Sequence, residues 1–555
     1  MGLMAHSEGG LKGREDSRGR VKVKNFVHSM TFPPSLRRLK NAFFLIFWIA
    51  AIPLSKAASK PNIVFFLVDD MGWQDTSVPF HTARTPFNDF FRTPAMERLA
   101  ASGVRLTQAY SCAVCTPTRV SWFTGRNATR HHITNWTLKG ETSGKSPQLL
   151  PPAWKKDGLQ PGDAPTAAEL LRKAGYRTIH IGKAHWGAVG TDGADPLKLG
   201  FDVNIAGHAA GAPGSFQGLE RYGEGKPGKE TWAVPGLADY KGKDIHLTDA
   251  LTTEACREME SCVKGNKQPF FLYLSHYAVH TPLQPHRPYL ENYQKQAVAE
   301  SEKHYASMVE GMDASLGRVL DKLKELEIAD ETLVVFYTDN GGLSHAVRGK
   351  NILGTAALTH NLPLREGKGS AYEGGIRVPA IITWAENNPA SDLQKKVPIT
   401  ANSRLAKPVM IEDLFPTFLN WAGVASPDSP IDGEDISPAL ANPSETRRKA
   451  SIFWHFPNVW TPYPADRHVG YQPHSTIRSG DWKAIYFHEP QTWELYDLGK
   501  DPGETRNLAQ SEFPRLTQLA RELSDRLNEM KSPLPVDRAT GKPRPLRLPS
   551  EIPPP

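Results

Sequence analysis

Four short hydrophobic runs, rich in β-branched or aromatic residues, recur along the first two thirds of the chain. They are residues 62–68, 176–181, 269–275 and 332–338. Three of them are almost continuously apolar, as in parallel strands that are buried on both faces of a sheet. Segments with helical spacing lie between the runs, at residues 94–100, 166–174, 251–263 and 301–328. This alternation predicts an α/β fold with a mostly parallel sheet.

The last quarter of the chain has a different pattern. Short alternating runs and a final helical segment occupy residues 452–454, 475–479, 482–486, 493–496 and 513–530. They predict a small antiparallel sheet packed against one helix. Composition changes near Pro427, so we expect a main domain over residues 58–426 and a smaller C-terminal α+β domain over residues 427–530. The Pro-rich residues 531–555 are expected to be extended or disordered.

Residues 1–57 have the pattern of a leader. A basic cluster ending at Lys40 precedes an uncharged run, residues 42–54, and small residues follow at 55–58. This order predicts a secretory signal peptide and a periplasmic or secreted protein. The run is short for a membrane span, so we expect no stable span after cleavage; an uncleaved anchor is the alternative. Met30 lies closer to the signal than Met1 and is an alternative start.

The composition and the distribution of charge bear on which classes of function are supported. The chain is 39% hydrophobic and 23% charged, as soluble globular proteins are. Residues 1–57 hold ten Lys or Arg residues and three acids, a net charge of +7 that equals the net charge of the whole chain. The remainder is therefore neutral, which gives no support for nucleic-acid binding.

The chain has only four cysteines. Cys112 and Cys115 form C-x-x-C, which fits a redox pair or half of a zinc site. Cys256 and Cys262 fall on different faces of a predicted helix and cannot bridge within it. No four-ligand zinc set and no disulfide scaffold is therefore available.

Acidic and amide side chains follow two of the predicted buried strands. Asp69 and Asp70 come directly after residues 62–68, and Asp339 and Asn340 come directly after residues 332–338. Ligands of open α/β sheets bind beyond the carboxyl ends of the strands. Because all four donors are hard oxygens, Ca²⁺ is the natural ion, and Mg²⁺ fits the same donors. Taken alone, the two aspartates also fit a turn with a helix-capping residue.

The segment Cys115-Thr116-Pro117-Thr118-Arg119 has the residues of a helix start that can bind an anion. Pro117 suits the first turn of a helix that begins just after Cys115. The free N–H groups at such a helix start favour negative charge, and Arg119, one turn later, could reach back to an anion held there. The alternative is a structural cysteine in a turn.

Basic residues follow other strands. Lys183 and His185 come after residues 176–181, and in extended backbone they would face the same side. His276 and His280 follow residues 269–275. Lys368 lies in a Gly-rich segment that lacks the spacing of a Walker phosphate loop. Taken alone, the Lys-x-His pair also fits ordinary exposed polarity.

Taken in order, five motifs resemble those of the type I sulfatases, from Pro61 to about Asn507. The resemblance covers the strand-end aspartates, the C-x-P-x-R pentapeptide, Gly-Lys-x-His-x-Gly, His-Thr-Pro, and Gly-Lys-Gly followed by Tyr-Glu-Gly-Gly-x-Arg-x-Pro. Val279 departs from the family's usual Pro. The resemblance implies an alkaline-phosphatase-like sandwich, with a large mixed, mostly parallel sheet flanked by helices.

The resemblance also implies roles for the site residues. Cys115 would be converted to formylglycine by a maturation enzyme, and its hydrate would attack sulfur. Ca²⁺ would lie on Asp69, Asp70, Asp339 and Asn340 and hold the nucleophile at Cys115. Arg119, Lys183 and Lys368 would neutralise the sulfuryl charge. His280 would protonate the leaving alcohol, with His276 ranked lower, and His185 would contact the second hydroxyl of the hydrate.

The expected activity is sulfuric ester hydrolysis on a sulfated polysaccharide or glycosaminoglycan fragment. A phosphoester or phosphonate hydrolase and a non-catalytic glycan-binding homologue are the alternatives. Residues 199–216 and 343–362 are expected to line the leaving-group side. Six side chains either contact substrate or belong to exposed loops and packing: His208, His345, His455, His474, Trp454 and Trp460.

Overall fold

The structure is a computed structural model that describes residues 60–265, 268–344, 347–355, 358–445, 448, 450–460 and 469–552. The predicted leader and His345 lie outside these residues. The chain divides into two compact units, 1–58 and 59–555, and the second contains every described residue. Within the described residues, no helix combines the length and apolar character that a membrane crossing needs.

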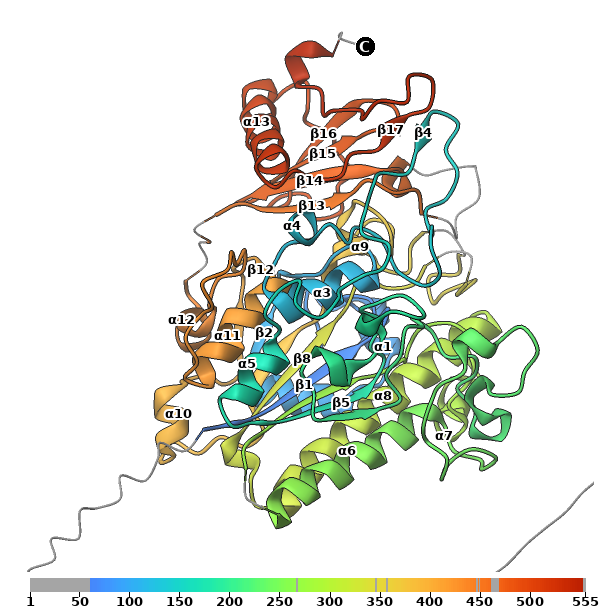
Figure 1. Cartoon of the computed structure of the whole chain (residues 1–555), viewed down its shortest axis with the longest axis vertical. Helices are drawn as coiled ribbons and strands as arrows, with labels where there is room; N and C mark the ends of the chain where they lie inside the picture. Colours follow the sequence, from blue (N-terminus) through green and yellow to red (C-terminus); the bar gives the residue numbers. More distant parts are fainter. Residues whose placement is uncertain are drawn as a thin grey trace, which may run out of the picture. The chain divides into compact units, whose positions relative to one another are not determined.

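The described residues of the main domain form an eight-stranded sheet with the order β11-β2-β10-β8-β1-β7-β5-β6 (Figure 1). Its centre is β1 (Asn62–Val68), which pairs in parallel with β8 (Thr332–Thr338) and with β7 (Phe270–Ser275). Beyond β7 lie β5 (Arg177–Gly182) and β6 (Val203–Ile205), both parallel. All four predicted strands are therefore present.

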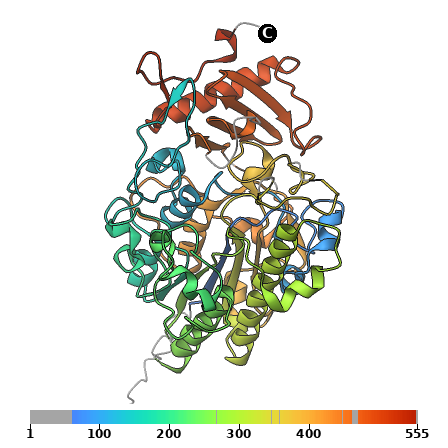
Figure 2. The ribbon, with the colours of Figure 1, turned by 90° about the vertical axis from the view of Figure 1, so that its right-hand side faces the viewer.

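Helices cover both faces of the sheet (Figures 1 and 2). One face packs on α2 (Pro94–Ser102), α6 (Leu247–Lys264) and α8 (Glu300–Glu325). The other face packs on α3 (Cys115–Thr124), α5 (Ala167–Lys173) and α11 (Leu414–Trp421). The fold is the expected sandwich of helices around a mixed, mostly parallel sheet.

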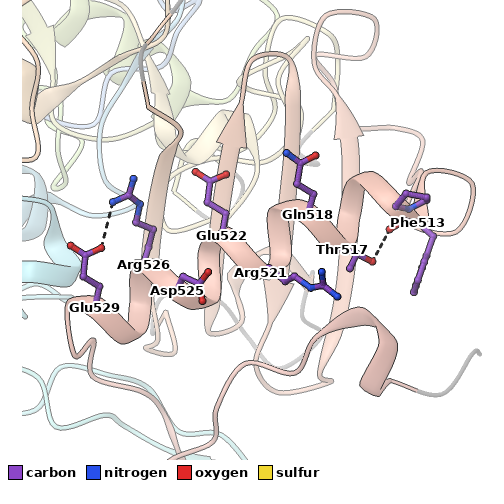
Figure 3. Close-up of a pocket in the computed structure, with 9 residues that line it drawn as sticks. Phe513, Thr517, Gln518, Arg521, Glu522, Asp525, Arg526 and Glu529 are labelled. Atoms are coloured by element: carbon purple, nitrogen blue, oxygen red, sulfur yellow. Dashed lines mark hydrogen bonds and ion pairs between the residues drawn. The ribbon is translucent and has the colours of Figure 1, made fainter.

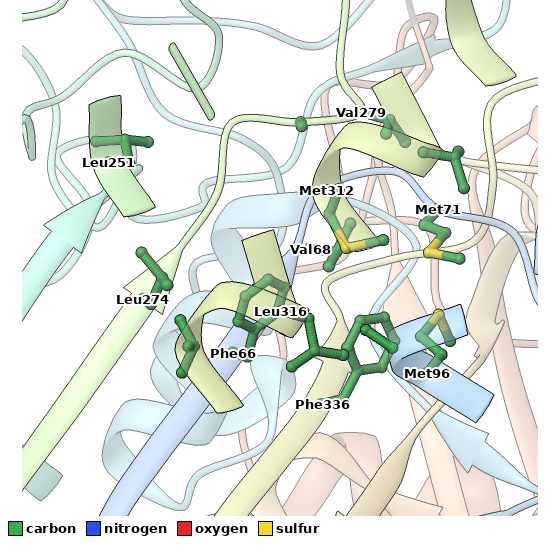
Figure 4. Close-up of a cluster of buried hydrophobic side chains, with 14 of the residues drawn as sticks. Phe66, Val68, Met71, Met96, Leu251, Leu274, Val279, Met312, Leu316 and Phe336 are labelled. Carbon is green, nitrogen blue, oxygen red and sulfur yellow. The ribbon is translucent and has the colours of Figure 1, made fainter. Parts of the chain in front are cut away.

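The two hydrophobic cores follow from the alternation along β1. Phe66 and Val68 point to the α8 side, where Figure 4 shows them among Met312, Leu316 and Phe336. Ile63, Phe65 and Leu67 point to the α3 side. Because apolar side chains occupy both faces of the strand, every residue of β1 is buried, as the continuous apolar run predicts.

Residues 103–110 contain two short strands, β2 (Val104–Leu106) and β3 (Ala109–Tyr110). β2 joins the large sheet, where it lies between β11 (Ser403–Leu405) and the antiparallel β10 (Ile381–Trp384). β3 joins a separate sheet with β9 (Arg377–Val378) and β12 (Val409–Met410). The chain changes sheet between them and then enters α3.

The C-terminal part matches the predicted sheet and helix. Four antiparallel strands pack on α13 (Phe513–Glu529): β13 (Ile452–Phe456), β14 (His474–Ser479), β15 (Trp482–Phe487) and β16 (Thr492–Asp497). Lys483 of β15 joins this sheet to the main domain, because its Nζ lies 3.0 Å from Glu373 and 2.8 Å from Glu504.

The Pro-rich end, which was expected to be extended or disordered, includes a short strand. Its strand β17 (Val536–Asp537) pairs with β4 (Leu149–Leu150), and Arg538 donates hydrogen bonds to main-chain carbonyls of the β4 region. Proline fixes φ without preventing such extended pairing at a sheet edge. The segment is therefore ordered by tertiary contacts that its composition does not reveal.

Candidate functional site

The predicted site residues converge at the carboxyl edge of the central strands. Asp69 and Asp70 follow β1, Asp339 and Asn340 follow β8, and Lys183 follows β5. These parallel strands lie within the consecutive order β8-β1-β7-β5, so their ends meet at one edge of the sheet. The strand between β1 and β5 is β7, and it contributes Ser275 at the same edge.

Three carboxylates and three cations form the centre of the site, and all are buried. Lys183 Nζ lies 2.6 Å from Asp69 Oδ2, and Lys368 Nζ lies 2.6 Å from Asp70 Oδ1. The Arg119 guanidinium donates to Asp339 Oδ2 through Nε at 3.0 Å and Nη2 at 2.8 Å. The six charges balance, which such deep burial requires.

Three of the four candidate ligands keep one oxygen for another partner, whereas both Asp339 oxygens already accept hydrogen bonds. Asp69 Oδ1, Asp70 Oδ2 and Asn340 Oδ1 are buried and accept no hydrogen bond from the described residues. Orphaned buried acceptors are rare in native proteins and point to an ion or water at the site. Because the free atoms are all hard oxygens, they fit a Ca²⁺-like cation.

The electrostatics of the carboxylates agree with a cation site. Burial and the neighbouring Asp339 raise the pKa of Asp69 well above its usual value. Burial acts in the same direction on Asp70, but Lys368 and His280 outweigh it and hold the pKa of Asp70 below its usual range. A bound divalent cation would relieve the repulsion between these carboxylates.

Cys115 is the first residue of α3, so the predicted helix start is correct to within one residue. Its side chain is buried, and burial raises the pKa of its thiol, while Lys183 and Lys368 act in the opposite direction. Both lysines therefore lie close enough to affect the charge at this position. Cys112 and Cys115 are both free thiols rather than a disulfide.

Arg119 makes different contacts from those expected. Its Nη1 donates to Ser275 Oγ at 2.6 Å and to the Lys183 carbonyl at 3.0 Å, while its other nitrogens hold Asp339. The guanidinium thus spans three strand ends instead of reaching back to an open anion position. The cause is the buried Asp339 carboxylate, which needs a fixed cation.

His185 also departs from the expected geometry. Its φ is 54°, so the backbone is left-handed there, and the argument from alternation in an extended strand does not apply. The ring Nε2 lies 2.9 Å from the Thr137 carbonyl. Because a carbonyl only accepts, Nε2 carries the proton and Nδ1 keeps a lone pair, which has no partner among the described residues. Burial lowers the pKa of His185, in agreement with a neutral ring.

His280 lies at the site, whereas His276 does not. His280 Nε2 is 3.4 Å from Asp70 Oδ2, and its Nδ1 lies 2.9 Å from the Thr281 carbonyl. Burial, assisted by Lys368, lowers the pKa of His280 to about 3. His276 Nε2 lies 2.9 Å from Ser315 Oγ of α8, inside the helical layer.

The Gly-rich segment brings Lys368 into the site. The Lys368 N–H donates to the Gly342 carbonyl, and the Gly369 N–H donates to the Ala113 carbonyl, so the segment bridges the turn after β8 and the loop before α3. Gly369 has φ 88°, and a Cβ there would lie 2.7 Å from the Trp460 ring. Trp460 also lies beside Lys368, whose Nζ is 5.8 Å from the ring centre.

Three contacts at the site were not predicted from the sequence. Ser275 and Tyr273 both lie within hydrogen-bond distance of Arg119 Nη1, and Thr137 holds His185. Ser275 could have been found, because it ends a buried strand as the aspartates do. Thr137 carries no comparable signal, since its main-chain oxygen makes the contact.

Most of the peripheral candidates pack in the structure. His455 contacts Ser475 Oγ and the Pro533 carbonyl, and His474 is buried beside the Gln472 carbonyl. Trp454 Nε1 donates to the Ser111 carbonyl and so supports the loop before Cys115. His208 is half-buried, and its carbonyl accepts from the His185 N–H.

A separate hollow lies along the exposed face of α13, with a volume of about 800 Å³. Figure 3 shows its lining side chains, among them Phe513, Arg521, Glu522 and Arg526. None of the predicted site residues belongs to it. The hollow is therefore no part of the candidate site at the edge of the main sheet.

Comparisons with known proteins agree with this arrangement. A model of the family described as Sulfatase matches residues 61–424, and one described as N-sulphoglucosamine sulphohydrolase, C-terminal, matches residues 367–533. A curated sulfatase from Formosa agariphila is 30% identical, and the match covers 85% of this chain and 88% of that protein. Human steryl-sulfatase is 26% identical, with 90% and 93% covered.

A solved structure, described as Ps i-CgsB in complex with k-i-k-neocarrahexaose, has a similar fold. Its TM-score is 0.64 at 29% identity, and the match covers 84% of this chain and 93% of that chain. The family match spans the strands that carry Asp69 and Asp339 and the helix that begins at Cys115. The chain therefore belongs to the sulfatase family of sulfuric ester hydrolases.

Proposed function

We propose that the protein hydrolyses sulfate esters of a sulfated carbohydrate, with Cys115 converted to formylglycine and one Ca²⁺ bound. The observation that carries the proposal is the position of Cys115, buried at a helix N-terminus beside a balanced cluster of three carboxylates and three cations. The carbohydrate class is supported by the similar structure named with a neocarrahexaose.

The ion would be held by Asp69, Asp70, Asp339 and Asn340. All of these except Asp339 keep an oxygen that has no partner among the described residues. When bound, it supplies Lewis-acid polarisation of a sulfate oxygen and orientation of the nucleophile. The formylglycine hydrate supplies a hydroxyl nucleophile that a thiol at this position does not. Mg²⁺ remains the alternative ion.

The residues of the chain prepare the pocket for an anion. Lys183 and Lys368 bring two ammonium groups to the Cys115 position, where they stabilise negative charge on the sulfuryl oxygens. Arg119 fixes Asp339 and the ends of β5 and β7, so its contribution is to hold the ligand oxygens in place.

The two histidines have opposite proton roles. Nδ1 of His185 has a free lone pair, so it can accept a proton from a hydroxyl at the Cys115 position. His280 is the proton donor to the leaving alcohol. An anionic ester beside Lys368 would offset the effect of that lysine and raise the pKa of His280 toward the value that a donor needs.

Two further proposals rest on the sequence. A formylglycine-generating or sulfatase-maturating enzyme would act on the segment around Cys115 before or during folding, because the folded chain buries that residue. The leader predicts export, so we propose a periplasmic or secreted location.

The test combines a mass measurement with an activity assay. In protein made with a maturation system, the tryptic peptide 106–119 should carry an aldehyde in place of the Cys115 thiol. The same protein should release sulfate from sulfated oligosaccharides and cleave an aryl sulfate faster than the matching aryl phosphate. An unmodified cysteine, with another sulfatase matured in the same host, would favour a non-catalytic glycan-binding protein, and preferred turnover of the phosphate would favour a phosphoester hydrolase.

A further inference from the structure

A second buried ionic cluster lies next to the candidate metal site, and the activity proposed above does not use it. Its centre is Arg348, a fully buried residue on the segment after β8. The guanidinium binds two carboxylates with forked geometry. Nε and Nη2 donate to Glu302 at 2.8 and 2.7 Å, and Nη1 and Nη2 donate to Asp75 at 2.9 and 3.2 Å.

Asp75 connects this cluster to the turn that carries Asp70. Its Oδ2 accepts from the Gly72 N–H at 2.9 Å and from the Tyr305 hydroxyl at 2.6 Å. Tyr305 OH also lies 3.2 Å from the Asp70 carbonyl. The turn is therefore held through its own main chain and not only through the Asp70 side chain.

The backbone of that turn needs such support. Asp70 has φ 63°, a left-handed conformation that costs free energy for a residue with a side chain. Unusual conformations of this kind persist only where the surroundings fix them. Here the Asp70 carbonyl is contacted by the Tyr305 hydroxyl and accepts from the Leu343 N–H at 3.2 Å.

Arg348 reaches the turn after β8 as well. Its Nη1 lies 3.1 Å from the Leu343 carbonyl, and Leu343 follows closely after Asp339 and Asn340. One guanidinium thus contacts the segment after β8 directly and the segment after β1 through Asp75. These two segments supply all four candidate oxygen ligands.

The geometry points to Arg348 as a positioning residue for the metal site. We propose that Arg348, acting through Asp75 and Tyr305, fixes the left-handed Asp70 turn and its spacing from Asp339 and Asn340, and thereby sets the affinity for the cation. The inference rests on the proposed function for the presence of the cation. It adds a set of residues that contact neither the ion nor the substrate.

The experiment measures Ca²⁺ affinity by calorimetry on the full-length mature protein after chelation. Arg348→Lys keeps the positive charge but loses the paired hydrogen bonds of the guanidinium. We expect it to weaken Ca²⁺ binding by about 10- to 100-fold, as removal of residues that support metal ligands does. Activity should fall at limiting Ca²⁺ and return at saturating Ca²⁺. A purely structural role would not produce this rescue.

Tyr305→Phe is the milder variant, needed because Arg348→Lys could prevent folding. It removes only the hydroxyl contacts to Asp70 and Asp75, and we expect about 2- to 10-fold weaker Ca²⁺ binding. Tyr176→Phe is the matched control. Its hydroxyl donates to the Pro61 carbonyl at 2.9 Å, at the opposite end of β1, so it should leave Ca²⁺ affinity unchanged.

The outcomes separate the two proposals. If the wild type binds Ca²⁺ and Tyr305→Phe binds it as tightly as Tyr176→Phe does, Arg348 and Tyr305 are not positioning residues. If the wild type binds no Ca²⁺, the metal in the proposed function is wrong and this inference fails with it. If Tyr305→Phe binds Ca²⁺ more weakly than the wild type and Tyr176→Phe does not, the inference is supported.

Discussion

Lys368 and Asp70 are almost 300 positions apart in the chain, yet Lys368 Nζ lies 2.6 Å from Asp70 Oδ1 in the buried site. The pair joins the Gly-rich segment to the end of the central strand. Asn340 Nδ2 donates to the same oxygen at 2.7 Å, so this oxygen is occupied and Asp70 Oδ2 remains for a cation. Lys368 and Asn340 therefore hold one oxygen of Asp70, and a cation would bind the other.

Lys368→Met should reduce kcat/KM on a sulfated oligosaccharide by about 100- to 1000-fold, the usual effect of removing one group that stabilises transition-state charge. The assay should be run at saturating Ca²⁺, because the substitution also leaves Asp70 with one cation fewer. Lys60→Met removes a lysine that bonds the Ala174 carbonyl far along the chain and serves as the control. Equal activity of the two variants would contradict the assigned role of Lys368.

Ca²⁺ should raise the thermal unfolding temperature of the chelated protein. A ligand that binds only the folded state stabilises it by about 2.7 kcal/mol at a free concentration of 100 Kd. Asp70→Asn should abolish the shift, because it removes a charged ligand at the cluster. Scanning calorimetry with Ca²⁺ and with Mg²⁺ also decides between the two ions, and a shift that survives in Asp70→Asn would place the ion elsewhere.

The protein should lose stability below pH 6.5 through buried histidines. Burial lowers the pKa of His276 to about 3, so in acid the unfolded chain takes up a proton that the folded chain does not. Stability is therefore complete above pH 6.5 and falls by at most about 1.4 kcal/mol per pH unit between 6.5 and 3 for this group. His276→Gln should flatten the fall in urea unfolding from pH 8 to pH 4.5, and an unchanged slope would show that His276 does not contribute.

Lys483 should be essential for the stability of the contact between the C-terminal sheet and the main domain. It is fully buried between Glu373 and Glu504. Lys483→Met leaves the buried Glu504 without its cation and Glu373 with Arg377 alone, and we expect a loss of about 3–5 kcal/mol in the free energy of unfolding. Adding Glu373→Gln and Glu504→Gln to that variant should restore part of the loss, as urea unfolding would show; no recovery would mean that packing rather than charge is responsible.

Local patterns along the chain are enough to predict most elements and the kinds of residue at the candidate site. The run from Asn62 to Val68 is a buried strand because its side chains are apolar on both faces, and that pattern is local. The same holds for the helix that begins at Cys115 and for the acids that end β1 and β8. Ligands of open α/β sheets bind beyond the carboxyl ends of the strands, so the position of the candidate site could be predicted as well.

Which of these residues pair with one another depends on the three-dimensional fold. The order of strands brings Arg119 to Asp339, Lys183 to Asp69 and the Arg348 cluster under Asp70, and no local pattern encodes pairings between residues so far apart. The local pattern also did not predict the left-handed backbone at His185. A buried charge needs an opposite charge beside it, and the fold rather than the local sequence determines which residue supplies that charge.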